Sequence, residues 1–277
     1  MTSINLKRWI RWIALAIVFS VACGFLANWQ LNRREQVVKV IQRVERNYDH
    51  QRVRLSLMVP RPTEFKLSRE YRRVWVSGNY VSTPPILIRN RPLDGVQGFE
   101  QLMAFRMDNG RVIYVDRGWL ATGDNPSVPA KMPMPATGHM LLVGRLKQAE
   151  PLDARSAPSN QAQSITPSAL ADQARIQTPA KYGNAGVYLA SYLLLEQESV
   201  KAPTGTLTTK PSLDEGNHLS YAFQWVIFAI MAFAAIGWGI RQEKLQARAA
   251  ADPTFVIKKR KRVGDADKAA EDALLGD

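Results

Sequence analysis

Two long apolar stretches without a charged side chain dominate the pattern of the chain. The first covers the sixteen residues 12–27 and the second the twenty-two residues 219–240. At about 1.5 Å per helical residue, the second run is roughly 33 Å long, which is enough for a hydrocarbon core of about 30 Å. A buried core helix is the alternative, but an uncharged run of this length is unusual for one. The pattern predicts transmembrane helices at 9–29 and 218–240.

Aromatic side chains stand at the ends of both runs. Trp12 and Trp29 bracket the first, and Tyr221 and Trp238 bracket the second, which is typical of the aromatic belts at a membrane surface. Because basic residues precede the first run, a signal peptide is an alternative there, and residues 20–23 lie near the place of a lipoprotein cleavage box. The serine in that stretch is a poor match to the bulky aliphatic position of such a box, which favours an uncleaved helix.

The orientation follows from the basic residues beside the second run. They accumulate after it and end in the block 258–262, whereas only Lys210 lies shortly before it. Basic residues favour the cytoplasmic side, so we expect a cytoplasmic tail at 241–277, which is polar enough to be disordered, and residues 1–8 on the same side. Charges around the first run argue weakly for the opposite orientation. Residues 30–217 then form one domain outside the cytoplasm.

The chain between the two runs has the pattern of a small β-rich domain. Helical spacing over 30–47 predicts a stalk that continues the first helix. Fifteen of the sixteen prolines then lie between residues 60 and 211, which predicts turns and short strands. Asn109-Gly110 predicts a β-hairpin, 186–195 predicts a strand, and Pro167 opens a helical insertion. The expected fold is an α+β membrane protein, in which two transmembrane helices flank a small antiparallel β-rich extracytoplasmic domain with a helical insertion.

Composition narrows the choice of partner and chemistry. The chain has 37 Lys+Arg against 24 Asp+Glu, for a net charge of +13, which suits an anionic partner. Most of this charge lies outside the cytoplasm, so we expect membrane lipids or an acidic protein, and no nucleic acid. The single cysteine, Cys23, excludes a disulfide within the chain. Histidines stand far apart at 50, 139 and 218, and no P-loop, dinucleotide motif or nucleophile elbow occurs, so we expect no enzyme.

One cluster of soft metal ligands lies in a proline-rich stretch. It consists of Met132, Met134, His139 and Met140, and thioethers with imidazole suit Cu(I). The alternative is a loop in which methionine fills gaps in the packing. A copper carrier is therefore the weakest of the function hypotheses.

His218 stands at the entrance of the second apolar run. Tyr221 and Trp225 follow it at i+3 and i+7 and can share its helical face. A histidine beside flat aromatic rings at the membrane edge is suitable as an axial haem ligand, and Arg33 or Arg34 at the same depth could pair with the propionates. The alternative interpretation is that these residues only anchor the helix at the membrane interface.

Four short motifs follow one another along residues 9–245. Their residues are Trp29, Gln30 and Arg33; Gly78 and Tyr80; Arg117, Gly118 and Trp119; and His218, Tyr221, Gln224 and Trp225. Each motif alone is modest, but the four together between two apolar runs are specific. In this order they resemble the signatures of the Surfeit locus protein one family, the cytochrome c oxidase assembly factors.

The resemblance implies an assembly factor for haem–copper oxidase that acts at haem a insertion into subunit I, or at the stabilisation of that subunit. It implies transient haem a binding, with His218 as the residue implicated at the iron. The expected partners are oxidase subunits, subunit I above all, a respiratory supercomplex and membrane lipids. The sequence has no Arg- and Ser-rich transit peptide, which favours a bacterial plasma membrane with both termini cytoplasmic. The alternative function is a stable structural accessory subunit of a respiratory supercomplex, without a cofactor of its own.

Overall fold

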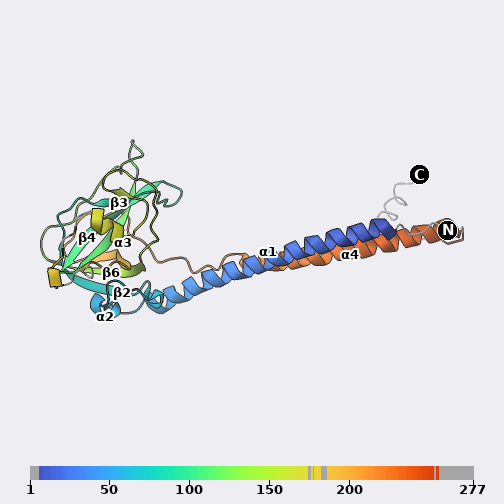
Figure 1. The fold of residues 1–277 in the computed structure, drawn as a ribbon, viewed down its shortest axis with the longest axis horizontal. Coiled ribbons are helices and arrows are strands. Elements are labelled where there is room, and N and C mark those ends of the chain that lie inside the picture. The colour runs from blue at the N-terminus through green and yellow to red at the C-terminus, as the bar shows by residue number, and fades with distance from the viewer. Residues whose placement is uncertain (1–5, 174–175, 177, 182–185, 253, 256–277) are drawn as a thin grey trace, which may run out of the picture. The chain divides into compact units, whose positions relative to one another are not determined.

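The computed structural model describes residues 6–173, 176, 178–181, 186–252 and 254–255 (Figure 1). The basic block expected to set the orientation, 258–262, lies outside the described residues. The chain divides into two compact units. A helical unit is formed by the chain up to Gln36 and from Glu215 onward, and a β unit is formed by Val37–Asp214.

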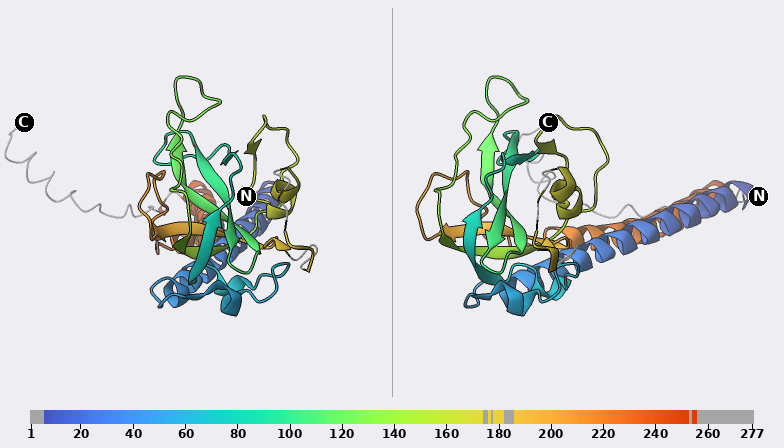
Figure 2. Two further views of the ribbon diagram at one scale, coloured as in Figure 1. Left: turned by 90° about the vertical axis from the view of Figure 1, so that its left-hand side faces the viewer. Right: turned by 60° about the vertical axis from the view of Figure 1, so that its left-hand side comes forward.

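The helical unit pairs two long helices in antiparallel fashion. They are α1, Leu6–Asn47, whose first thirty-one residues belong to this unit, and α4, His218–Ala251. The two run side by side in Figures 1 and 2. An ion pair fixes each end of the pairing, because Arg8 lies 2.6 Å from Glu243 and Arg34 lies 2.6 Å from Glu215.

Small side chains line the contact between the two helices. The buried residues of this unit are Ala16, Cys23 and Ala27 on α1 and Ala222 on α4, and small residues let helix backbones approach closely in a membrane. Only 17% and 6% of the most apolar stretches of the two helices are buried. The core helix of a soluble protein would be mostly buried. Both helices are long and apolar enough to cross a membrane.

The β unit contains eight strands within the described residues, together with short helices α2, Leu55–Met58, η1, Leu67–Arg69, and α3, Pro167–Gln173. Three of these strands have only two or three residues, whereas the other five have eight to ten, so the expectation of short strands is met only in part. They are β1, Val53–Arg54; β2, Arg73–Tyr80; β3, Ile86–Ile88; β4, Gly98–Met107; β5, Val112–Ala121; β6, Met140–Gln148; β7, Gln161–Ala162; and β8, Ser191–Glu198.

Five of these strands close into a barrel. The strand order is β1-β2-β6-β8-β5-β4-β3-β7, and an additional pairing of β2 with β4 joins the ends of the segment β2-β6-β8-β5-β4. Figure 2 shows β6 and β8 crossing below the steeper strands. Closure removes the exposed sheet edges that would otherwise invite pairing with other chains.

The sheet is mixed, so the expectation of an antiparallel sheet was wrong. Strand β8 pairs with β5 in parallel, and β1–β2 and β3–β7 are parallel as well. The long connection from β5 through β6 and the helical insertion returns the chain in the same direction, as a parallel pair requires. The alternation of apolar residues does not encode strand direction, which is why the sequence pattern could not reveal this pairing.

Alternation along the strands produces two large apolar clusters and a small third one of Leu87, Phe99 and Leu120. One large cluster fills the barrel and takes side chains from all five barrel strands, for example Val74, Phe105 and Leu193. The other large cluster lies on the outer face and is covered by α3, whose Leu170 is buried in it. The hairpin at Asn109-Gly110 and the helix that starts at Pro167 are confirmed.

The strand expected over 186–195 begins later, at Ser191. The amides of Leu189 and Ala190 donate to the carbonyl of Pro62, at 2.9 and 3.3 Å, instead of continuing the sheet ladder. A backbone carbonyl outside the sheet therefore determines where this strand starts.

Candidate functional site

The first and fourth motifs of the sequence meet in the helical unit. His218 is the first residue of α4, and its Nδ1 lies 2.9 Å from Oε1 of Gln30 on α1. A carboxamide oxygen only accepts hydrogen bonds, so Nδ1 is the donor of a hydrogen bond between these two atoms. In a neutral ring, the nitrogen that does not carry the hydrogen holds the lone pair.

The turn before α4 places a glycine beside the Nε2 edge of His218. Gly216 has a φ of +68°, a conformation that favours glycine. A Cβ placed on Gly216 would lie 3.7 Å from both Cδ2 and Nε2 of His218. The preceding Glu215 pairs with Arg34, at 2.6 Å. The ring edge that carries Nε2 therefore adjoins a glycine in a turn that is held to α1.

The aromatic residues of the fourth motif differ in their exposure on α4. Trp225 is half-buried and packs edge-to-face on Phe228, with ring centroids 5.8 Å apart. Tyr221 is exposed, at 50%. His218, Tyr221 and Trp225 stand at i, i+3 and i+7 of one α-helix, within about 60° of one another around its axis, so they lie on one helical face, of which Tyr221 is the more exposed part.

The remaining motif residues and arginines near this site differ in their exposure and in the ion pairs and hydrogen bonds that they form. Arg34 is committed to Glu215, whereas Arg33 is exposed and donates only a long hydrogen bond, of 3.4 Å, to Gln36. Trp29 is exposed at 59%, and Gln224 is exposed too. Of the two arginines considered for propionates, Arg33 is the one that is not held in an ion pair by the described residues.

The third motif, Asp116-Arg117-Gly118-Trp119, forms a β-bulge. Glu100 of β4 lies opposite Trp119 and Leu102 opposite Asp116, so two residues of β5 face a single residue of β4. Gly118 takes a φ of +106°, which a side chain would strain. The bulge places Arg117 on the inner side of the barrel, and Asp116 and Trp119 on the outer side.

The second and third motifs meet inside the barrel at Glu198, a residue that the sequence did not predict. Arg117 is fully buried, and its Nε and NH2 lie 3.0 and 3.3 Å from the carboxylate oxygens of Glu198, the last residue of β8. Tyr80 donates its hydroxyl to the same carboxylate at 2.7 Å. Burial, followed by the Glu198 charge, raises the pKa of Tyr80, so that the phenol stays protonated.

The remaining donors of Arg117 hold two loops over this end of the barrel. NH1 donates to the carbonyl of Pro133 at 3.1 Å and to Gln101 at 3.4 Å, and NH2 donates to the carbonyl of Pro203 at 3.1 Å. With Glu198, these contacts use all five guanidinium hydrogens. A buried charge needs such complete pairing. Through these hydrogen bonds, Arg117 holds both loops to the strands.

The two motif glycines allow close backbone approaches. At Gly78, β2 changes partner from β6 to β4, and a Cβ there would overlap the carbonyl of Arg106. A Cβ at Gly118 would lie 2.8 Å from the carbonyl carbon of Gly205. The glycines therefore form a barrel corner and a chain crossing, and both support the fold.

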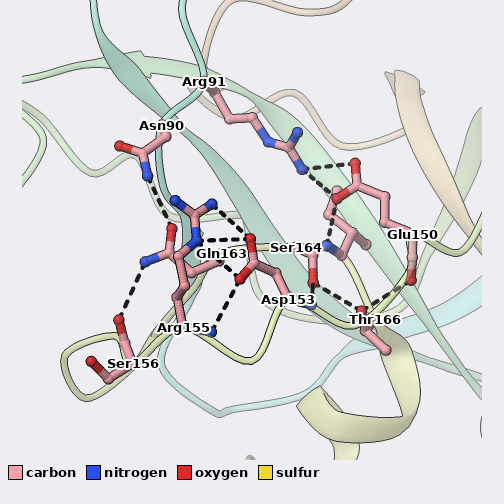
Figure 3. Close-up of polar contacts among 10 residues, drawn as sticks. Asn90, Arg91, Glu150, Asp153, Arg155, Ser156, Gln163, Ser164 and Thr166 are labelled. Atoms are coloured by element: carbon pink, nitrogen blue, oxygen red, sulfur yellow. Dashed lines mark hydrogen bonds and ion pairs between the residues drawn. The ribbon is translucent and has the colours of Figure 1, made fainter.

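Arg91 organises the polar groups outside the barrel. Its guanidinium lies 2.9 Å from Glu100 and 2.6 Å from Glu150, and its carbonyl accepts from Trp119 Nε1 at 2.6 Å. Figure 3 shows this guanidinium pointing at the Glu150 carboxylate. In the same view, the Glu150 carbonyl accepts from Thr166 at 3.0 Å. This contact ties the segment before α3 to the strand end.

A buried carboxyl group lies on the same outer face. Asp116 is 2% exposed, and its Oδ1 accepts the amide of Gly118 at 2.8 Å. Within the described residues no hydrogen bond reaches Oδ2. Burial, reinforced by the charge of Glu100, raises the pKa of Asp116 to about 8. Asp116 is therefore protonated at neutral pH.

The fold does not bring together the four soft metal ligands predicted from the sequence. Met140 is buried in the barrel core, while Met132 and Met134 are exposed at 44% and 51%. His139 lies 2.9 Å from Oδ1 of Asp108 and 3.1 Å from Oγ of Ser77. Nor do the described residues contain a group of three His, Cys, Asp or Glu side chains that could hold a metal ion.

The fold and its paired motifs define a class of protein that combines a unit of two antiparallel apolar helices with a unit that contains a mixed β-barrel. Residues 17–230 match the model of the SURF1 family. The chain belongs to the SURF1 family, which is known broadly for cytochrome oxidase assembly factors, so the resemblance found in the sequence is confirmed.

Relatives within the family support this assignment over most of the chain. An uncharacterised SURF1-like protein of Mycobacterium bovis is 30% identical over 231 residues, covering 82% of each chain. Uncharacterised SURF1-like proteins of Mycobacterium tuberculosis match to the same extent. A SURF1-like protein of Dictyostelium discoideum is 27% identical over 115 residues, covering 39% of this chain and 42% of the relative.

Proposed function

We propose that this chain is an assembly factor for haem–copper cytochrome c oxidase that assists haem a insertion into subunit I or stabilises that subunit. The contact between His218 and Gln30 carries the proposal, because it leaves Nε2 of the ring as an electron-pair donor at the end of an apolar helix. Membership of a family of oxidase assembly factors supports the choice of client.

The residues around His218 fit a haem. Gly216 adjoins the Nε2 edge without a side chain of its own, and Trp225 offers a flat apolar surface on the same face of α4. Arg33 would pair with a propionate, since a guanidinium binds a carboxylate with two parallel hydrogen bonds. In these roles His218 would hold the iron, Trp225 would pack on the porphyrin and Arg33 would orient it. Bound haem a would supply the redox-active iron that the oxidase needs.

The proposed location is a bacterial plasma membrane, crossed by α1 and α4, with the β unit outside the cytoplasm and both ends of the chain inside. The two apolar helices support a membrane location, and the lysine and arginine residues after the second apolar run support the orientation. In this arrangement the β unit can reach the outer surface of an oxidase subunit and the lipid headgroups. We propose no nucleic-acid partner and no catalytic activity.

One observation favours a second candidate, a stable accessory subunit of a respiratory supercomplex. His218 is the single histidine of the helical unit's sequence, so a second axial histidine from that unit is absent. A permanent subunit would need no ligand at all. The two candidates differ in stoichiometry, because an assembly factor is substoichiometric on mature oxidase, whereas a subunit is present once per complex.

An absorption spectrum tests the main proposal. The full-length protein, purified in detergent from cells that make haem a, should carry haem a absorbance, and His218→Ala should remove it while the protein remains abundant. His50→Ala is the matched control, because His50 is an exposed histidine of the β unit. Undiminished haem a in His218→Ala would overturn the ligand assignment.

A further inference from the structure

We propose that Gln30 is a positioning residue, which holds His218 in the tautomer with hydrogen on Nδ1 and so directs the Nε2 lone pair toward haem iron. The inference deepens the proposed function and rests on it. Its structural basis is the distance of 2.9 Å between Gln30 Oε1 and His218 Nδ1.

Both partners of this contact are placed by the pairing of the helices. Ala27 and Ala222 lie one turn further into the pair, at 7% and 5% exposure, and their small side chains bring the backbones together. On the other side of the contact, Arg34 and Glu215 form their ion pair at 2.6 Å. Gln30 is half-buried between these two fixed points. The helix pairing thus determines where the carboxamide meets the ring.

The chemistry of the carboxamide selects one tautomer. A neutral imidazole carries one hydrogen, on either Nδ1 or Nε2, and the partner of one nitrogen decides which form prevails. Histidine ligands of metals usually donate their second ring N–H to a carboxylate, carbonyl or water, and loss of such a partner typically costs about 10- to 100-fold in metal affinity. Gln30 supplies a neutral carbonyl, which avoids an additional charge at the start of an apolar helix.

The tautomer can be measured without haem. Nitrogen-15 NMR of the haem-free full-length protein in lipid nanodiscs, with labelled histidine and His218→Ala for assignment, should show Nδ1 protonated and Nε2 unprotonated in the neutral ring. Gln30→Leu keeps the side-chain size and removes the acceptor, so the Nε2–H form should appear. Gln42→Leu changes an exposed glutamine further along α1 and should leave the tautomer unchanged. A neutral ring protonated at Nε2 in the unmodified protein would overturn the inference.

Haem a titration of the same variants gives the second readout. Gln30→Leu should weaken haem a binding about 10- to 100-fold, whereas Gln42→Leu should bind as the unmodified protein does. Unchanged affinity in Gln30→Leu would overturn the positioning role. If His218→Ala retained haem a while NMR showed hydrogen on Nδ1, the proposed function would fail. If His218→Ala lost haem a while NMR showed hydrogen on Nε2, only the role of Gln30 would fail.

Discussion

Arg117 and Glu198 form an ion pair whose side chains are 0% and 3% exposed, with Nε of the arginine 3.0 Å from the carboxylate. The pair lies at one end of the barrel, where Tyr80 shares the carboxylate and two loop carbonyls share the guanidinium. Such a pair adds little net stability relative to apolar residues, but loss of one partner leaves a buried charge unpaired. Arg117 and Tyr80, which belong to the motifs of the family, therefore support the fold.

Removal of Arg117 alone should be strongly destabilising. Arg117→Met leaves Glu198 buried without its partner and should cost about 3–5 kcal/mol of unfolding free energy. The double variant Arg117→Met with Glu198→Met should recover part of this loss, because neither charge remains. Chemical denaturation of the detergent-solubilised protein measures both. Equal losses in the single and double variants would contradict a role for the unpaired charge.

Trp119 should act through packing on the outer face of the barrel. Its indole lies against Gly98, where a Cβ would overlap the ring, and Nε1 donates to the carbonyl of Arg91 at 2.6 Å. We expect Trp119→Ala to cost about 3–5 kcal/mol and to lower the abundance of the protein. Trp119→Phe, which loses the hydrogen bond and keeps most of the ring, should cost about 1–3 kcal/mol.

Abundance and oxidase maturation separate packing from a partner contact at Trp119. If Trp119→Ala left protein abundance unchanged in cells but abolished oxidase maturation, this side chain would be a contact to a partner. Gly98→Ala, which displaces the indole without removing it, should lower abundance in the same way as Trp119→Ala if packing is the cause.

The raised pKa of Asp116 predicts a pH-dependent stability. The folded-state pKa of about 8 exceeds the ordinary value of 3.8, so between about pH 4 and pH 8 the folded state holds a proton that the unfolded state has released. Stability should therefore fall as the pH rises through this window, by at most about 1.4 kcal/mol per pH unit. Asp116→Asn imitates the protonated acid and should flatten this slope. Unfolding curves of the two proteins that stay parallel from pH 5 to pH 8 would contradict the assignment.

The orientation in the membrane can be tested with reporters. A reporter fused after Asp277 should be active in the cytoplasm, and one inserted near Pro158 should be active outside. The asymmetry of basic residues around α4 is the reason. Cytoplasmic labelling of the region around Pro158 would reverse the proposed topology.

How much of this structure the sequence could predict depends on the range of the interactions. The helices, the hairpin at Asn109-Gly110 and the helix at Pro167 follow from local patterns of length, charge and turn residues. The contact between Gln30 and His218 joins residues 188 positions apart. No local pattern encodes such a contact, although both residues stood in recognised motifs.

The partner of Arg117 was missed for the same reason. Glu198 is 81 positions away from Arg117, and its one signal in the sequence is that it is one of two carboxylates that follow the apolar residues of this strand. A carboxylate in that place needs a buried cation or donor. The parallel pairing of β5 with β8 left no signal of its own, because alternation is the same for both strand directions.

A side chain at position 216 should restrict access to Nε2 of His218. Gly216→Ala would place a methyl group 3.7 Å from Nε2 and Cδ2, in a backbone conformation that costs a non-glycine residue about 1–2 kcal/mol. We therefore expect haem a to bind more weakly to Gly216→Ala, by roughly tenfold, the equivalent of about 1.4 kcal/mol. Gly237→Ala is the matched control, because a Cβ at Gly237 meets nothing within 4 Å. Equal haem a affinity of the two variants in a spectroscopic titration would show that the Nε2 edge of His218 is not where the iron binds.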